Sequence, residues 1–257
     1  MRLRRLLPEP GELETEELAG ILRLGDRARD ERPYVVANMV SSADGRATVA
    51  GRSGPLAGEA DRQLFHALRA SVDAVLAGTG TIAVERYGRL VRDEARRERR
   101  AAAGLAPDPL AVIVTRSGEV PWDAPLFAAP EQRVIVFTGE AVEPPTDAAA
   151  QVEVVPVAGG EATATAALAE LRARHGVRSV LCEGGPLLLG ALLAGKALDE
   201  LFLTIAPLLA GAGERTVVEG SILADAAALE LTWLLECEGA LFARYGVDVT
   251  PAKGERA

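Results

Sequence analysis

Cysteine and histidine are scarce in this sequence, and their scarcity excludes several kinds of site. The 257 residues include two cysteines, Cys182 and Cys237, and two histidines, His66 and His175. No C-x-x-C pair is present and no Cys/His set has the spacing of zinc ligands, so we expect no metal site. Two isolated cysteines fit a reducing cytoplasm, although the sequence leaves a single disulfide open.

Long apolar runs are also missing. No stretch approaches the roughly 20 apolar residues of a membrane helix, and the basic N-terminus is not followed by the apolar run of a signal peptide. We therefore expect a cytoplasmic protein without a membrane partner. Aromatic residues make up 4% of the chain, so the core must be built mainly from Ala, Val and Leu.

A basic surface is absent as well. Lys and Arg number 28 and Asp and Glu 37, which gives a formal net charge of −9. We expect no nucleic-acid partner, because neutralising phosphates requires a basic patch. One basic stretch, residues 92–100 (RDEARRERR), also carries three acidic residues, and we interpret it as a solvated helix or loop.

Short apolar runs alternate with helical patterns through most of the chain. The apolar runs predict strands that are buried on both faces, at residues 34–40, 72–77, 110–115, 133–137, 152–157, 179–182 and 198–205. Helical spacing predicts helices at residues 57–70, 163–175 and 186–194. The alternation predicts an α/β protein with three layers, in which a mostly parallel central sheet carries helices on both faces.

The two ends of the chain differ from this pattern. Residues 231–238 and 241–249 are predicted to form a C-terminal antiparallel hairpin that turns at Glu238 and Gly239. Residues 1–32 contain Pro8, Pro10 and Gly11, and we interpret them as an N-terminal extension with one short helix at residues 12–24. Residues 33–257 are then one domain, because no boundary inside them is convincing.

Two glycine-containing turns follow predicted strands directly. The first is Gly78-Thr79-Gly80-Thr81, and the second is Glu183-Gly184-Gly185-Pro186. Glycines at such a turn let the backbone approach a ligand closely, and a following helix offers free N–H groups that suit phosphate. Pro186 suits the first helical position. Tight turns without a ligand remain an equal alternative, and neither segment is the G-x-G-x-x-G fingerprint of a Rossmann domain.

Charged residues near these turns are further candidates. Glu183 would repel an anion beside it, so we expect its side chain to point into a substrate pocket, or else to be a carboxylate that only stabilises the helix start. Arg62, His66 and Arg69 share one face of the predicted helix at 57–70. This cationic stripe meets a substrate phosphate or is solvated.

Three blocks of sequence resemble the pyrimidine reductase family of the riboflavin pathway. They are residues 38–46 (NMVSSADGR), residues 58–81 from Gly58-Glu59-Ala60-Asp61-Arg62 to Gly78-Thr79-Gly80-Thr81, and Cys182-Glu183-Gly184-Gly185-Pro186 followed by residues 198–201 and 205–207. The resemblance covers about residues 33–250. It implies a dihydrofolate-reductase-like fold, a homodimer, NADPH as hydride donor and a phosphorylated ribosylamino-pyrimidine as substrate.

The resemblance also implies which residues form the site. Catalytic candidates, which would polarise the substrate or relay a proton unless solvent supplies it, are Glu183 and Asp44. Substrate-binding positions are Asn38, Ser41 and Arg62. Cofactor-binding positions are Gly78, Thr79, Gly80, Thr81, Gly184, Gly185 and Pro186. Arg116 and Ser117 join them, because they follow the strand at 110–115, where this fold places the adenosine end. Arg116 either pairs with the 2′-phosphate of NADPH or is an ordinary turn arginine.

The chain departs from its bifunctional relatives in two ways. It lacks the H-x-E and P-C-x-x-C motifs of their deaminase domain. Where many relatives carry Asp-Asp-Pro, this sequence has Val84-Glu85-Arg86-Tyr87-Gly88, in a segment that we expect to face the pocket. Two alternatives therefore stay open: a reductase of the same fold that acts on a pterin, folate or other heterocycle, and a non-catalytic NADPH-binding protein.

Overall fold

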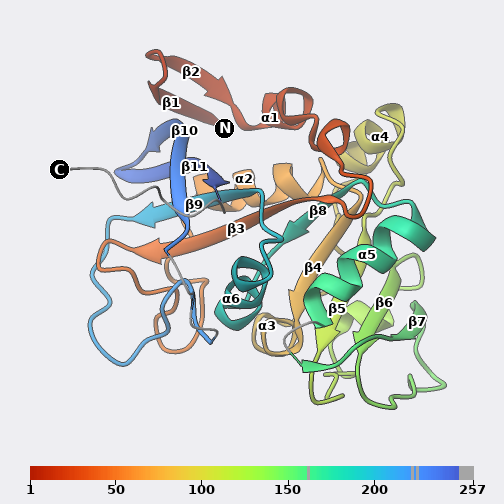
Figure 1. The fold of residues 1–257 in the computed structure, drawn as a ribbon. Coiled ribbons are helices and arrows are strands. Elements are labelled where there is room, and N and C mark those ends of the chain that lie inside the picture. Colours follow the sequence, from red (N-terminus) through yellow and green to blue (C-terminus); the bar gives the residue numbers. More distant parts are fainter. Residues whose placement is uncertain (161–162, 221–222, 224–225, 249–257) are drawn as a thin grey trace.

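One large twisted sheet runs through the whole molecule (Figure 1). The structure is a computed structural model, which describes residues 1–160, 163–220, 223 and 226–248. Eleven strands are hydrogen-bonded in the order β2-β1-β10-β11-β9-β3-β8-β4-β5-β6-β7. Their bounds are β1 Arg2–Leu7, β2 Gly11–Glu14, β3 Tyr34–Ser42, β4 Ala74–Gly78, β5 Leu110–Thr115, β6 Arg133–Thr138, β7 Gln151–Pro156, β8 Ser179–Cys182, β9 Glu200–Ala206, β10 Ala228–Cys237 and β11 Ala240–Asp248.

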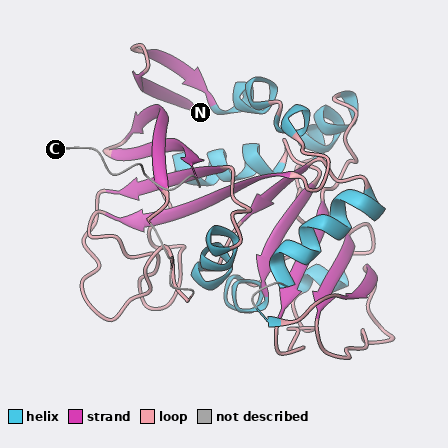
Figure 2. Ribbon diagram, viewed as in Figure 1, coloured by secondary structure: helices cyan, strands magenta, loops and turns pink. Residues whose placement is uncertain are grey.

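Helices cover both faces of this sheet (Figure 2). They are α1 Thr15–Leu22, α2 Glu59–Arg69, α3 Thr79–Glu85, α4 Glu94–Ala102, α5 Thr163–His175 and α6 Pro186–Ala194, with short 3₁₀ turns η1 Leu24–Arg27 and η2 Pro125–Ala128. In Figure 1, α5 and α6 lie on the near face and α2 on the far face. The predicted three-layer α/β arrangement is therefore confirmed.

The sheet has a parallel half and an antiparallel half. Strands β9, β3, β8, β4, β5, β6 and β7 pair in parallel with their neighbours. The hairpin of β10 and β11 joins antiparallel to β9, and it turns at Glu238 and Gly239 as predicted; Val249, the last residue of the predicted strand, lies outside the described residues. Parallel strands carry their carboxyl ends to one edge, which is where α/β proteins bind ligands.

Alternate residues of the central strands form two separate apolar cores. On the α2 face, Val36 and Phe202 pack with Leu64 and Leu68 of the helix. On the opposite face, Val35 and other strand residues pack with α5 and α6. Strand residues buried on both faces explain why the sequence shows continuous apolar runs rather than alternation.

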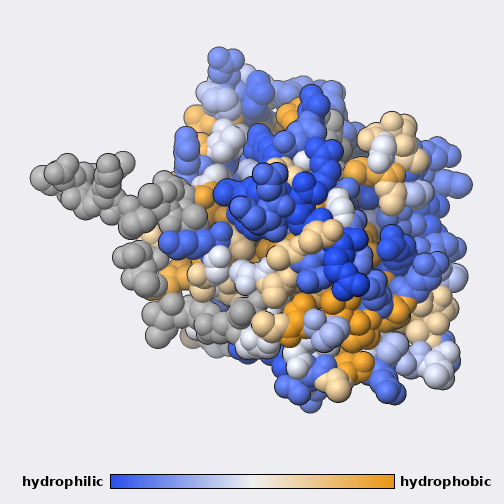
Figure 3. Space-filling model, turned by 45° about the vertical axis from the view of Figure 1, so that its right-hand side comes forward, coloured by the Kyte–Doolittle hydropathy of each residue, from blue (hydrophilic) through white to orange (hydrophobic). Residues whose placement is uncertain are grey.

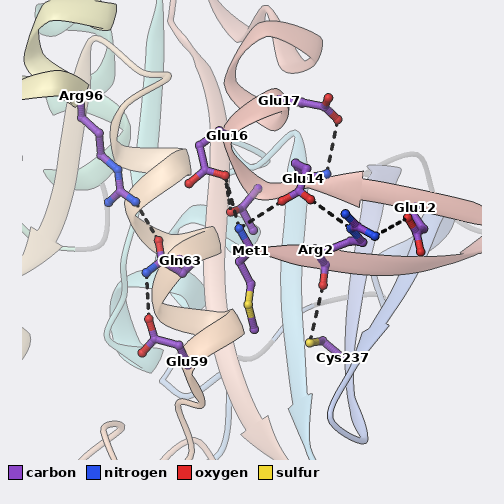
Figure 4. Close-up of polar contacts among 11 residues, drawn as sticks. Met1, Arg2, Glu12, Glu14, Glu16, Glu17, Glu59, Gln63, Arg96 and Cys237 are labelled. Atoms are coloured by element: carbon purple, nitrogen blue, oxygen red, sulfur yellow. Dashed lines mark hydrogen bonds and ion pairs between the residues drawn. The ribbon is translucent and has the colours of Figure 1, made fainter.

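The first 32 residues add two strands to this sheet. We predicted one helix at residues 12–24, but residues 11–14 form β2, and the helix α1 begins at Thr15. β1 pairs with both β2 and β10, and the side chains of Leu3 and Leu13 are buried in the α2-face core. Figure 4 shows that Arg2 lies between Glu12 and Glu14 across the hairpin; its Nε donates to Glu14 Oε1 at 3.2 Å. Such opposite-charge pairs stabilise neighbouring strands.

No helix in the described part of the chain is long and apolar enough to cross a membrane. Both cysteines are free thiols. Cys182 is buried in β8, and burial raises the pKa of its thiol to about 12.

Candidate active site

A cavity of about 1120 Å³ lies where the parallel strands end. Its wall includes most of the residues predicted from the sequence: Asn38, Arg62, Gly78, Thr79, Gly80, Thr81, Arg116, Ser117, Glu183, Gly185 and Pro186. Val84 of α3 and Leu187 of α6 also line it, and both side chains are exposed apolar groups. In Figure 3, apolar surface gathers in the lower part of the molecule, the level at which Figure 1 places α3 and α6. A large, partly apolar cavity with a few charged groups is typical of a small-molecule site.

The two glycine turns lie side by side because β4 and β8 are neighbours in the sheet. The backbone N–H of Gly78 donates to the carbonyl oxygen of Gly184 at 2.9 Å. A Cβ atom on Gly185 would lie 3.1 Å from Thr81 Oγ1, a contact tighter than side chains usually make. Two turns separated by more than 100 residues of sequence thus form one bare backbone surface.

This surface suits the diphosphate of a dinucleotide. Helix α6 begins after Gly185, which provides no side chain to cap its first N–H groups, and the helix dipole favours an anion there. Arg116 and Ser117 are exposed at the carboxyl end of β5 and line the same cavity. The residues present therefore fit a phosphorylated cofactor that extends from α6 toward β5. Gly184 lies buried below this surface and does not line the cavity.

Glu183 is held by two side chains in the cavity wall. Arg69 of α2 donates from Nε to Oε1 at 2.6 Å and from Nη2 to Oε2 at 2.7 Å. The Tyr87 hydroxyl donates to Oε2 at 2.6 Å. Only 1% of the Glu183 side chain is exposed. Both oxygens accept hydrogen bonds from Arg69, so Glu183 organises the wall that faces the cavity.

Burial and charge act in opposite directions on the partners of Glu183. Burial alone would lower the pKa of Arg69, but the adjacent Glu183 carboxylate raises it above its ordinary value. Burial and the same carboxylate raise the pKa of the Tyr87 hydroxyl well above its usual range. Arg69 also stacks on the rings of Phe65 and Tyr87, at 4.2 and 4.9 Å from their centroids. Tyr87 belongs to the segment in which this chain departs from the Asp-Asp-Pro of many relatives, and that segment lines the cavity as expected.

The predicted cationic stripe of α2 divides into a buried and an exposed part. Arg62 is exposed; its Nη2 lies 3.0 Å from Glu59 Oε2 and its Nη1 donates to the Ala57 carbonyl at 2.9 Å. His66 lines the cavity half-buried, and burial followed by the charge of Arg69 lowers its pKa. Figure 4 shows how Arg96 of α4 reaches this helix, with Nη2 donating to Gln63 at 2.8 Å.

Asp44 and Ser41 are not among the residues that line the cavity. Asp44 accepts hydrogen bonds from the Ser42 hydroxyl and from the N–H groups of Ala210 and Gly211. These bonds, that of Ser42 first, hold the pKa of Asp44 well below its usual range. Its contacts are those of a carboxylate that ties the turn after β3 to the loop after β9.

The interpretation of residues 92–100 as a solvated segment is wrong at its end. Arg100 of α4 is 1% exposed, and its Nη1 donates to the carbonyl oxygens of Arg69 and Val72 at 2.9 and 2.8 Å. Burial lowers the pKa of Arg100 to about 10. Arg92 and Arg96 of the same segment line the cavity. The sequence did not reveal these contacts. Acidic residues lie between the arginines, so the segment resembles a solvated helix, and spacing alone does not tell which face of a charged helix is covered.

Comparison with known proteins identifies relatives across nearly the whole chain. Residues 33–241 match the family described as the RibD C-terminal domain. The 2,5-diamino-6-ribosylamino-4(3H)-pyrimidinone 5′-phosphate reductase of Archaeoglobus fulgidus is 30% identical over 74% of this chain and 87% of its own length. The enzyme of the same name from Methanothermobacter thermautotrophicus is 30% identical over 78% of this chain and 91% of its own length.

Other relatives show the extent of the likeness. The riboflavin biosynthesis protein RibD of Mycobacterium tuberculosis is 32% identical over 81% of this chain, which spans 52% of that protein. A pyrimidine reductase-like protein from Corynebacterium diphtheriae has a similar structure, with a TM-score of 0.76 and 25% identity over 93% of this chain and 100% of that chain. With its dihydrofolate-reductase-like fold, the chain belongs to the riboflavin-pathway pyrimidine reductase family.

Proposed function

We propose that this protein is an NADPH-dependent reductase that converts a phosphorylated ribosylamino-pyrimidine, such as 5-amino-6-(5-phosphoribosylamino)uracil, to its ribitylamino form in riboflavin biosynthesis. One observation carries the proposal: a single cavity joins the two glycine turns to the wall of Glu183, Arg69 and Tyr87. The names of the relatives support the choice of substrate class.

In this proposal the cavity has a cofactor side and a substrate side. Gly78, Thr79, Gly80, Thr81, Gly185 and Pro186 hold the diphosphate, with Gly184 supporting the turn, and Arg116 and Ser117 hold the adenosine end. When bound, the dihydronicotinamide supplies a hydride to the C1′ carbon of the opened ribose. The protein aligns the two reactants and excludes water, since the cofactor carries the difficult chemistry.

The substrate side contains groups of both charges. Asn38 reaches the cavity from β3, and Arg62 offers a guanidinium to the substrate phosphate from the first turn of α2. Glu183 keeps Arg69 and Tyr87 in place, where they polarise the substrate. Ser41 and Asp44 stay predictions; the bonds of Asp44 support a role in shaping the loop after β9, which carries Arg215 to the cavity wall.

The test is NADPH consumption with product identification by mass. The panel consists of the uracil substrate, its 2,5-diamino-pyrimidinone counterpart, dihydrofolate and a dihydropterin. We expect turnover with a ribosylamino-pyrimidine phosphate and a product heavier by two hydrogens. Turnover of the pterin or folate alone would identify the protein as a reductase of the same fold that acts on a pterin or folate. Binding of NADPH without consumption on any substrate would assign a non-catalytic protein.

We also propose a cytoplasmic homodimer. In β10, residues 228–232 are exposed, including Leu229 and Leu231. β1 pairs with β10 only from Leu234 to Glu236, so within the described residues the outer edge of β10 before Leu234 has no strand partner. A free strand edge with apolar side chains is a surface that a second copy would cover.

A further inference from the structure

A second carboxyl group of the cavity, that of Asp61, differs from Glu183 because no arginine is bound directly to it in the described part of the chain. Asp61 lies in the first turn of α2, is 6% exposed and lines the cavity. Its Oδ1 has no hydrogen-bond partner among the described residues. A buried carboxylate without a partner is costly, so this group needs either a proton or a ligand.

The strands beneath Asp61 also present polar side chains. Val40 of β3 pairs with Thr204 of β9, and Asn38 pairs with Phe202. Residues two apart on a strand share a face, so Asn38 and Thr204 face α2, as Phe202 does in the core. Asn38 Oδ1 is buried and has no hydrogen-bond partner within the described part of the chain, whereas the Thr204 hydroxyl acts on Asp61 itself. Buried polar groups are rarely left unpaired, and Asn38 and Asp61 both line the cavity, so a polar ligand in the cavity would complete this wall.

This wall adjoins the turn that we assign to the cofactor. Met39, the neighbour of Asn38, points to the other face of β3, and its Sδ lies 3.3 Å from where a Cβ of Gly184 would be. The polar wall and the glycine turn thus meet across the thickness of one strand. Because Asn38 and Asp61 line the same cavity as Gly78 and Gly185, a substrate that contacts them would share that cavity with the cofactor.

Burial favours the protonated form of Asp61 and outweighs the groups around it, which favour the ionised form. Burial raises its pKa above the ordinary value; the Thr204 hydroxyl and then the Arg62 guanidinium lower it by less. Beside Asp61, strands β3 and β9 contribute the neutral Asn38 and Thr204, and the Glu200 carboxylate farther along the same face of β9 is paired with Arg244. The other charged or titratable groups of α2 that line the cavity are His66 and Arg69, and Arg69 is already bound to Glu183.

We propose that Asp61 is the proton donor of the reduction. The inference rests on the proposed function and deepens it. In the ring-opened substrate the C1′=N double bond accepts the hydride of the dihydronicotinamide at C1′ and the proton of the Asp61 carboxyl group at nitrogen. The product is a secondary amine, the cofactor leaves oxidised, and the Asp61 carboxylate regains a proton from solvent before the next turnover.

The first test compares Asp61→Asn with Asp147→Asn, a matched change at an exposed position outside the cavity. We expect Asp61→Asn to lower kcat roughly 10²-fold or more, the range of acid–base residues, with NADPH affinity unchanged. The wild-type rate should fall as the pH rises through the raised pKa of Asp61, because the donor is then ionised. Asp61→Asn should lose this dependence, and Asp147→Asn should keep it. An Asp61→Asn variant with the wild-type rate and pH profile would overturn the proposal.

Chemical rescue provides a second test in case the Asn side chain of Asp61→Asn disturbs folding. Asp61→Ala removes the carboxyl group and leaves space where it stood. Added formic acid should restore part of the lost rate in Asp61→Ala and have no effect on Asp147→Ala. Failure of formic acid to restore any rate in a folded, NADPH-binding Asp61→Ala protein would count against a proton-donor role.

Two further measurements test the protonation of Asp61 without requiring the enzyme to turn over a substrate. At a pH just above the ordinary pKa of Asp, which is about 3.9, infrared difference spectra between the wild type and Asp61→Asn should show the carbonyl band of a protonated acid. The folded state holds a proton that the unfolded state has released, so wild-type stability falls as pH rises through this window. The melting temperature of Asp61→Asn should therefore exceed that of the wild type by more at higher pH. An ionised Asp61 in the spectra would overturn the proposal, even in an active enzyme.

The two proposals fail differently. If the wild type reduces no ribosylamino-pyrimidine, the proposed function fails and the donor role falls with it, whatever the spectra show. If the wild type is active and Asp61→Asn is equally active, only the assignment of Asp61 fails and solvent is the proton source.

Discussion

Two arginines of helix α2 show how burial changes the contribution of an ion pair. The Arg69 side chain is 10% exposed and pairs with an almost fully buried Glu183, whereas the Arg62 side chain is 53% exposed and pairs with an exposed Glu59. Removing one partner of a buried pair leaves an uncompensated charge. We expect Arg69→Met to lower the free energy of unfolding by about 3–5 kcal/mol.

Arg62→Met is the matched control for this change. An exposed pair is screened by water, and its loss should cost about 0–1 kcal/mol. Urea denaturation of both variants measures the difference. If Arg69→Met and Arg62→Met lower the free energy of unfolding equally, Glu183 finds another partner when Arg69 is absent.

In the proposed site, the arginine that follows β5 belongs to the cofactor side. Arg116 is exposed and lines the cavity, so its guanidinium is available to the 2′-phosphate that distinguishes NADPH from NADH. Arg116→Ala should weaken NADPH binding by about tenfold, or about 1.4 kcal/mol, and leave NADH binding unchanged. Titrating both cofactors by fluorescence measures the two affinities. A parallel loss for NADH would show that Arg116 contacts a part that both cofactors share.

Among the helices and strands, local sequence patterns were sufficient to predict the bounds of buried elements. Predicted bounds agree with the structure for β5, β8, α5 and α6, because a buried strand requires an apolar run and a helix requires capping and spacing that are visible locally. The pattern failed for β1 and β2. Their charged residues alternate with buried leucines only because β10, more than 200 residues away, provides the other half of the pairing.

The candidate site was also predictable from the sequence only in part. Glycines after strands predicted two ligand-binding turns, and one cavity joins both turns; their role in binding a cofactor stays a prediction. The pairing of Glu183 with Arg69 and Tyr87 depends on how α2 packs across the sheet, which no local spacing encodes. Asp61 was missed because an acidic residue in the first turn of a helix is typical of an ordinary helix start.

The turn between β8 and α6 offers a test of the cofactor surface. Gly184 has a φ of +83°, so a side chain there would strain the backbone itself. Gly185 has no such restriction, but its Cβ would press on Thr81 at the cavity wall. We expect Gly185→Ala to fold and to bind NADPH about tenfold more weakly.

Gly58→Ala is the control for Gly185→Ala, because a Cβ at Gly58 meets nothing within 4 Å and Gly58 does not line the cavity. Calorimetric titration with NADPH and thermal melting should be measured on both. Normal NADPH affinity in Gly185→Ala would place the diphosphate away from this turn.

For the whole molecule, the exposed part of β10 predicts self-association. The Leu229 and Leu231 side chains are 47% and 40% exposed, and a two-fold axis would bring each against its own copy. Leu231→Arg should place like charges together and raise the dimer dissociation constant about 100-fold or more, which is about 2.8 kcal/mol. Light scattering across a dilution series measures this constant.

Ile21→Arg is the control, since Ile21 of α1 is 60% exposed and lies on another element. It should leave association unchanged. If Leu231→Arg and the wild type have the same mass at every concentration, β10 is not the contact between copies.

The position of β1 in the sheet also determines when folding is able to finish. Arg4 pairs with Glu236, so β1 has to wait for a strand that is synthesised more than 200 residues later. Until then Leu3 and Leu13, which end up buried, remain exposed on the nascent chain. Contacts so distant in sequence slow folding, and exposed apolar strands favour aggregation. Synthesis of this protein should therefore depend on chaperones that hold the N-terminal hairpin until β10 emerges.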